Sequence, residues 1–133
     1  METELLIIDD DEIALMLHDQ SVISGGLHSS PKLFSKPEVA LLYVKENKDE
    51  NKTLVLLLDI NMPVMNGWEL LDALDLDKDD KQVLVVLVTS SVDPDDRLKA
   101  EKYSHIIEFI EKPFTRHTAR KLRTHNALQG IFG

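Results

Sequence analysis

Five blocks of apolar residues stand out along the chain, each bounded by polar or turn-forming residues. They span residues 4–8, 31–34, 54–58, 83–88 and 106–110. Continuous apolar runs of this length are typical of strands whose two faces are both buried. The block at 31–34 is short and partly polar, and we expect only a weak strand there.

A helical segment is predicted after each strand. The expected helices span residues 13–24, 38–47, 68–74, 94–103 and 116–128. Asp93 and Thr115 are placed to cap the last two helices, because a short polar side chain can accept hydrogen bonds from the free N–H groups of the first turn. We expect Gly67 to make the turn before the third helix, because glycine adopts a positive φ without steric cost.

Strands and helices thus alternate five times, which predicts a parallel sheet covered by helices on both faces. Right-handed crossovers leave few topologies, and the flavodoxin-like, doubly wound strand order 2-1-3-4-5 is the natural one. No repeat or linker divides the sequence. We therefore expect an α/β fold in which residues 1–133 form a single domain.

The composition narrows the class of protein. The chain of 133 residues has a formal net charge of −9 and contains no cysteine. This charge disfavours general nucleic-acid binding, which depends on Lys and Arg neutralising phosphates, and it favours cations or basic partners. No apolar run is long enough to span a membrane, and residues 1–4 lack the basic start of a signal peptide. We expect a cytoplasmic protein without disulfides.

Residues suited to chemistry follow four of the predicted strands. Asp9 and Asp10 follow the first, Asp59 the third, Thr89 the fourth, and Lys112 the fifth. In this topology the carboxyl ends of these strands meet at one edge of the sheet. Two carboxylates about 4 Å apart repel each other by roughly 4 kcal/mol at an effective dielectric near 20. The cluster therefore predicts either a bound cation or a carboxylic acid that stays protonated.

Mg²⁺ is the expected cation, because it takes oxygen ligands and shares its coordination sphere with phosphate. With the hydroxyl of Thr89 and the positive charge of Lys112, the cluster has the groups needed to transfer a phosphoryl group to an acid. Each residue also has a plainer interpretation. A strand-end aspartate can cap the next helix, Thr89 can be an ordinary strand-end hydroxyl, and Lys112 can be a surface lysine. Their joint occurrence at matching strand ends favours the chemical interpretation.

Four motifs resemble those of the receiver domain of two-component response regulators, and in particular the single-domain, chemotaxis-regulator type. They are Ile8-Asp9-Asp10-Asp11, Leu58-Asp59-Ile60-Asn61-Met62-Pro63-Val64-Met65-Asn66-Gly67, Val88-Thr89-Ser90 and Lys112-Pro113-Phe114. The resemblance covers nearly the whole chain, and its second motif is highly specific. It implies one receiver domain over residues 1–133, with no output domain.

The resemblance also implies a role for each residue of the cluster. Asp59 is the expected phosphoacceptor and one of the Mg²⁺ ligands. Asp10 is expected to bind the metal directly, Asp9 through water, and Asn61 through its backbone carbonyl.

Three further roles follow from the same resemblance. Thr89 is the expected switch hydroxyl, and Lys112 the lysine that pairs with the phosphoryl group. Phe109 occupies the position of the aromatic switch residue. The Lys112–Pro113 peptide bond is expected to be cis.

The implied function is signalling, with no catalysis beyond the domain's own phosphorylation and dephosphorylation. A sensor histidine kinase or a phosphotransfer protein would phosphorylate Asp59. The domain would then bind a downstream protein target, as a monomer or as a phosphorylation-dependent dimer. Neither nucleic acid nor membrane is an expected direct partner.

Two helices offer candidate interaction surfaces. The consecutive apolar residues from Ile13 to Leu17 point all round the first helix, so one sheet face cannot bury them all. The rest either pack against a neighbouring helix or form an exposed patch, which the resemblance implies is for a kinase. The last helix carries only basic charges, which make either an output surface or an ordinary solvated helix. These basic residues are Arg116, Arg120, Lys121 and Arg123.

A second family shares part of the pattern. The segment from Asp9 to Asp11 is also similar to that of the haloacid dehalogenase phosphatases, with Asp9 as the nucleophile. Those enzymes need a further acidic metal motif after the lysine, and no Asp or Glu follows Lys112. They also leave Asp59 without a role. A receiver domain that only binds partners is disfavoured by the intact acids and lysine.

Overall fold

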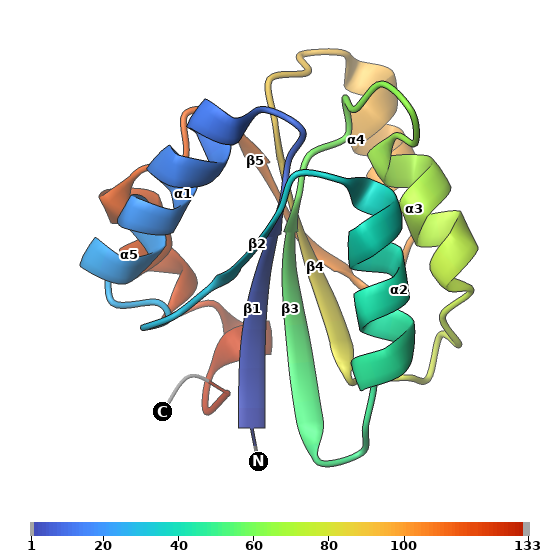
Figure 1. The fold of residues 1–133 in the computed structure, drawn as a ribbon, viewed down its shortest axis with the longest axis horizontal. Helices are drawn as coiled ribbons and strands as arrows, with labels where there is room; N and C mark the ends of the chain where they lie inside the picture. Colours follow the sequence, from blue (N-terminus) through green and yellow to red (C-terminus); the bar gives the residue numbers. More distant parts are fainter. Residues whose placement is uncertain (1, 132–133) are drawn as a thin grey trace.

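The computed structural model describes residues 2–131, and it contains one five-stranded parallel sheet (Figure 1). The strands are β1 (Glu2–Ile8), β2 (Lys32–Phe34), β3 (Lys52–Leu58), β4 (Val83–Thr89) and β5 (Ile106–Glu111). Their order is β2-β1-β3-β4-β5, which confirms the predicted topology. The predicted domain of residues 1–133 includes residues 1 and 132–133, which lie outside the described part.

A helix follows each strand. The helices are α1 (Glu12–Ser24), α2 (Pro37–Asn47), α3 (Gly67–Leu74), α4 (Pro94–Ala100) and α5 (Arg116–Leu122), followed by a short 3₁₀ helix, η1 (Asn126–Leu128). In Figure 1, α1 and α5 lie on one side of the sheet, and α2, α3 and α4 on the other. None of the helices within residues 2–131 combines the length and the apolar character needed to cross a membrane.

The central strands divide their side chains between two cores. On β3, Leu54, Leu56 and Leu58 face the core beneath α2 and α3. The alternating residues Val55 and Leu57 face the core beneath α1 and α5. Because successive side chains of a strand point to opposite faces, a strand with a helix layer on each side must be apolar throughout. This explains the continuous apolar run from which β3 was predicted.

The last two helices begin where the sequence predicts, but they end earlier. Asp93 caps α4 and Thr115 caps α5, each by accepting a hydrogen bond from a first-turn N–H. The predicted ends near residues 103 and 128 are wrong, because the chain leaves the α-helical pattern after Ala100 and Leu122.

The early end of α5 has a local cause. The N–H groups of Thr124 and His125 bond to carbonyls three residues back, and the Thr124 hydroxyl also donates to the carbonyl of Lys121. Such side-chain bonds compete with the helical pattern at a helix end. The ring of His125 then accepts a hydrogen bond from the N–H of Ala127 and starts η1.

Gly67 is needed for a different reason from the one predicted. Its φ is not positive, so the predicted left-handed turn is wrong. Gly67 is the first residue of α3, and Asn66 caps the helix in a reciprocal capping box with Glu69. A Cβ atom on Gly67 would lie 2.8 Å from the carbonyl oxygen of Asp59. Glycine is therefore required because α3 starts directly against the backbone of the site loop.

We predict that Gly67→Ala lowers the free energy of unfolding by about 1–3 kcal/mol, the usual cost of overpacking a close contact. Urea denaturation measures this difference. Asn66→Asp is the matched control, because aspartate caps a helix about as well as asparagine and should leave stability within about 0.5 kcal/mol of the wild type. Wild-type stability in Gly67→Ala would contradict the close contact.

Candidate functional site

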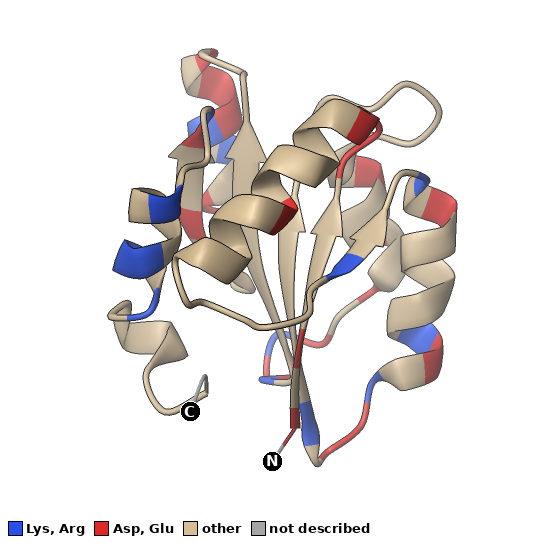
Figure 2. Cartoon of the chain, turned by 60° about the vertical axis from the view of Figure 1, so that its left-hand side comes forward, with Lys and Arg blue, Asp and Glu red and all other residues tan. Residues whose placement is uncertain are grey.

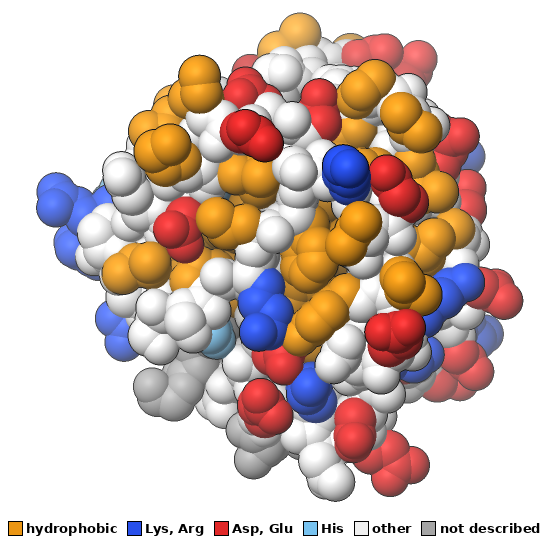
Figure 3. Space-filling view, viewed as in Figure 1, with side chains coloured by type: hydrophobic (Ala, Val, Ile, Leu, Met, Phe, Trp, Pro, Cys, Tyr) orange, Lys and Arg blue, Asp and Glu red, His pale blue; other side chains and the backbone are white. Residues whose placement is uncertain are grey.

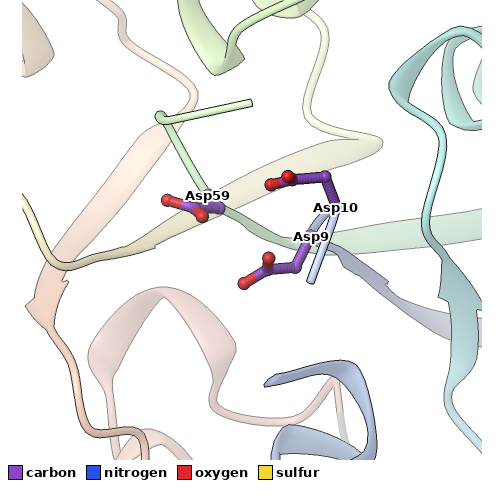
Figure 4. Close-up of side chains that lie close together, drawn as sticks. All are labelled: Asp9, Asp10 and Asp59. Atoms are coloured by element: carbon purple, nitrogen blue, oxygen red, sulfur yellow. The ribbon is translucent and has the colours of Figure 1, made fainter. Parts of the chain in front are cut away.

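The register between β1 and β3 brings two aspartates together. Ile8 pairs with Leu58 at the end of the two strands, so the next residues, Asp9 and Asp59, leave the sheet side by side. The N–H of Asp59 donates to the carbonyl of Ile8, at 3.0 Å. This bond fixes the positions of Asp9 and Asp59 relative to each other. Figure 4 shows the carboxylates of Asp9, Asp10 and Asp59 gathered at this edge.

The three acids have the composition and spacing of a metal site. One carboxylate oxygen from each of Asp9, Asp10 and Asp59 lies within 4.8 Å of the others. Asp9 is only 1% exposed and Asp59 6%, whereas Asp10 is exposed. Oxygen ligands of this kind suit a hard divalent cation such as Mg²⁺, and the exposed side leaves room for water and phosphate. The acids therefore fit the predicted metal.

Lys112 joins two of these acids. Its ammonium lies 2.8 Å from Oδ2 of Asp9 and 3.3 Å from Oδ2 of Asp59. Its backbone N–H donates to the carbonyl of Thr89 at 2.8 Å, which holds the start of the loop after β5 against β4. The Lys112–Pro113 peptide bond that follows is cis. One cation thus offsets part of the repulsion between two buried carboxylates.

Burial and the charge of Asp9 raise the pKa of Asp59 above its ordinary value, although Lys112 and the N–H of Asn61 oppose the shift. Burial alone would lower the pKa of Lys112, but its hydrogen bonds and charge interactions with Asp9 and Asp59 outweigh that effect and raise it. The lysine therefore stays charged, while Asp59 is held in a site where ionisation is costly.

Thr89 ends β4 on the same edge and is completely buried. Its hydroxyl oxygen accepts a hydrogen bond from the side-chain amide of Asn61, at 3.4 Å, and one from the N–H of Ser91, at 3.2 Å. The N–H of Asn61 also donates to Oδ1 of Asp59, at 3.2 Å. Asn61 therefore links the loop that carries Asp59 to the end of β4. Its side-chain contact was not foreseen, because only its backbone carbonyl had an expected role.

Phe109 lies earlier on β5 and contacts another element. Its ring is half-buried against the core beneath α2 and α3, and the guanidinium of Arg97 on α4 lies 4.5 Å from its centre. Asp11, the acid next to the metal group, caps α1 by accepting from the N–H groups of Ile13 and Ala14. The plain interpretation of a strand-end aspartate therefore holds for Asp11.

His18 and Phe114 form a contact that the sequence did not signal. His18 on α1 is buried, and its ring packs edge-on against Phe114, two residues after Lys112, with 5.7 Å between ring centres. Burial and the charge of Lys112 lower the pKa of His18. The Ser21 hydroxyl donates to the carbonyl of Phe114 at 3.2 Å. Helix α1 therefore braces the loop that carries Lys112.

The surface of α1 is partly apolar, as expected. Leu15 is buried, whereas Ile13, Met16 and Leu17 are exposed. Figure 3 shows several apolar patches on the face that carries α1, β2 and α2. Leu33 on β2 and Val39 and Leu42 on α2 are also exposed. By contrast, Figure 2 shows blue but no red on α5, the helix near the C-terminus.

A family model for the response regulator receiver domain matches residues 5–123. The chain belongs to this family. The matched region contains every residue of the acid cluster together with Thr89 and Lys112, and the phosphatase alternative with Asp9 as nucleophile is thereby set aside. This receiver domain is a signalling domain and not an enzyme of the ordinary kind.

Several known proteins are similar to this receiver domain. A two-component response regulator structure from Cytophaga hutchinsonii is 29% identical, with 91% of this chain and 93% of that chain covered and a TM-score of 0.74. A response regulator receiver protein from Dyadobacter fermentans is 25% identical, with coverages of 91% and 94% and a TM-score of 0.78. The two-component response regulator ORR1 of rice (Oryza sativa subsp. japonica) is 27% identical over 91% of this chain and 54% of its own length. The chain thus spans about half the length of that relative.

We predict that Asp59→Asn raises the stability of the metal-free protein at pH 7 by roughly 1 kcal/mol, because it removes a repelling buried charge. The raised pKa of Asp59 sets the pH dependence. Ionisation of Asp59 costs stability in the wild type as pH rises through its folded-state pKa, so the difference should shrink toward pH 4 and vanish below the ordinary value of 3.8. Urea denaturation at several pH values measures it.

Asp79→Asn is the control for net charge, since Asp79 lies on an exposed loop. It should leave stability nearly unchanged over the same pH range. A loss of stability in Asp59→Asn at pH 7 would show that the Lys112 contact outweighs the repulsion.

Proposed function

We propose that this receiver domain takes up a phosphoryl group on Asp59, in a Mg²⁺-dependent reaction, from a sensor histidine kinase or a phosphotransfer protein. The observation that carries the proposal is that the Asp59 carboxylate lies beside the buried Asp9 and shares the ammonium of Lys112 with it. Membership of the receiver domain family supports it.

In the proposed reaction, an oxygen of the Asp59 carboxylate attacks the phosphorus atom of a phosphohistidine. The new P–O bond makes an acyl phosphate as the P–N bond breaks, and the electron pair of that bond returns to the imidazole. Lys112 can then bond to an oxygen of the transferred group, and the Thr89 hydroxyl can donate to another. Both residues already lie at this edge of the sheet.

Asp9, Asp10, Asp59 and the backbone carbonyl of Asn61 are the residues that we propose for holding Mg²⁺. The bound ion would offset the negative charge that the acids and the phosphoryl group bring together. Asp9 and Asp10 have no other part in the proposed reaction.

The proposed output is a change in a protein-binding surface. The exposed apolar residues of α1 are suited to dock against the kinase or phosphotransfer protein, since α1 also braces the loop of Lys112. We propose Thr89 and Phe109 as the switch residues. A downstream protein target, a cytoplasmic location and action as a single domain stay predictions of the same proposal. So does the oligomeric state, either a monomer or a phosphorylation-dependent dimer.

The reaction is tested by treating the protein with acetyl phosphate and Mg²⁺ and measuring its intact mass. We expect one added phosphoryl group in the wild type and none in Asp59→Asn, because that substitution removes the nucleophile. Asp79→Asn should label like the wild type. Equal labelling of Asp59→Asn would show that another residue is the phosphoacceptor.

The metal site makes a separate prediction. Mg²⁺ at ten times its dissociation constant should raise the free energy of unfolding by about 1.4 kcal/mol, because it binds the folded acid cluster and not the unfolded chain. Asp10→Ala should lose most of this gain, whereas Asp79→Ala should keep it. Denaturant unfolding with and without Mg²⁺ measures the effect, and a wild-type curve that Mg²⁺ does not shift would contradict the site.

A further inference from the structure

A chain of hydrogen bonds leads from the phosphoacceptor loop to the first turn of α4. Asn61 and the N–H of Ser91 both donate to the hydroxyl oxygen of Thr89. The hydroxyl of Ser91 then donates to Oδ2 of Asp96, and its oxygen accepts from the N–H of Asp93, at 3.3 Å. Ser91 is therefore bonded to the site through its backbone and to α4 through its side chain.

The hydrogen bonds that the Thr89 hydroxyl already accepts determine which further bond it can form. A hydroxyl oxygen has two lone pairs and one proton. Both lone pairs already face N–H donors, so the proton is the group left to bond with a phosphoryl oxygen on Asp59. If Thr89 moves toward that oxygen, its bond with the N–H of Ser91 must either break or carry Ser91 with it.

If Ser91 moves with Thr89, its side-chain hydrogen bond exerts a force on the first turn of α4. Its hydroxyl donates to a carboxylate, and charge-assisted hydrogen bonds of this kind are short and strong. Asp96 lies in the first turn of α4, where a negative charge also interacts favourably with the helix N-terminus. Displacement of Ser91 is therefore passed to the start of the helix.

Helix α4 buries little apolar surface against the rest of the fold, so a displacement of its first turn can move the whole helix. It has seven residues, of which Ala100 is buried, and Leu98 is 59% exposed. Its other described side-chain contacts include two cation–π pairs, Arg97 with Phe109 and Lys99 with Trp68. Elements with little buried apolar surface lie at the low-stability end of a fold and are the ones that move.

We propose that Ser91 and Asp96 are a coupling pair that transmits the movement of Thr89 to α4. The inference rests on the proposed phosphorylation of Asp59 and adds a route to the surface that does not pass through the ring of Phe109. Coupling between two sites is reciprocal. The attachment of α4 therefore also opposes the movement of Thr89 and lowers the affinity of the pocket for a phosphoryl group.

The test uses beryllofluoride with Mg²⁺ as a phosphoryl mimic and compares the wild type with Ser91→Ala and Asp96→Ala. Two quantities are measured, the dissociation constant of beryllofluoride and the change that it causes in amide hydrogen exchange over residues 94–100. Both variants should lose most of the change in exchange. Both should bind the mimic more tightly, by about fivefold or more, the lower range of allosteric coupling.

Two matched variants separate coupling from simple damage to the helix. Asp95→Ala removes a carboxylate from the same turn without touching Ser91, and it should behave like the wild type. Ser91→Thr keeps the hydroxyl and should restore both quantities toward wild-type values.

A full exchange response in both Ser91→Ala and Asp96→Ala would overturn the coupling pair while leaving phosphorylation intact. An equal loss in Asp95→Ala would also overturn it, because the effect would then belong to the helix in general. A wild-type protein that does not bind beryllofluoride would overturn the proposed function itself, and the coupling with it.

Discussion

The placement of one ammonium group between two buried carboxylates is the constraint on which the site depends. Lys112 can reach both Asp9 and Asp59 only because β1 and β3 are neighbours and the loop after β5 returns to the same edge of the sheet. The doubly wound strand order meets these conditions together. If the loop after β5 ended elsewhere, the two neighbouring carboxylates would have no cation within reach, and that arrangement is costly.

The site lies between the buried central strand β3 and the mostly exposed helix α4. β3 is buried on both faces and fixes Asp59, and Gly67 lets α3 start directly against the loop that follows. On the other side of the site, α4 buries Ala100, and its described side-chain contacts include the hydrogen bond between Ser91 and Asp96 and two cation–π pairs. Charge can therefore be placed accurately at one point while a nearby surface remains free to change.

The sequence predicted the strand order and the residues at the strand ends because both follow from long-range regularities. A doubly buried strand is apolar throughout, and a site residue follows where it stops, as with Leu58 and Asp59. Helix ends were less predictable, since Thr124 and His125 end α5 through local bonds that compete with a good helical pattern. The reason for Gly67 was also missed, because a close approach between distant backbones leaves no trace in local turn preferences.

Side-chain contacts between elements could not be predicted from the sequence either, because contacts between distant segments leave no local pattern. Nothing in the pattern shows that Ser91 bonds to Asp96, although both lie near the cap at Asp93. The packing of His18 against Phe114 depends on how α1 and α5 lie across one face of the sheet. These contacts connect the surroundings of the acid cluster to α4 and α1, and no local sequence pattern signals them.

The most direct test of the account is the titration of the Asp59 side chain itself, followed by carbon-13 NMR of its carboxyl group with and without Mg²⁺. In the metal-free protein its pKa should lie above the ordinary value of 3.8, because burial and Asp9 disfavour the charged form more than Lys112 favours it. Addition of Mg²⁺ should lower this pKa, since a bound cation stabilises the carboxylate. A pKa at or below 3.8 that does not respond to Mg²⁺ would contradict the account of Asp59 as a buried acid in a metal-binding cluster.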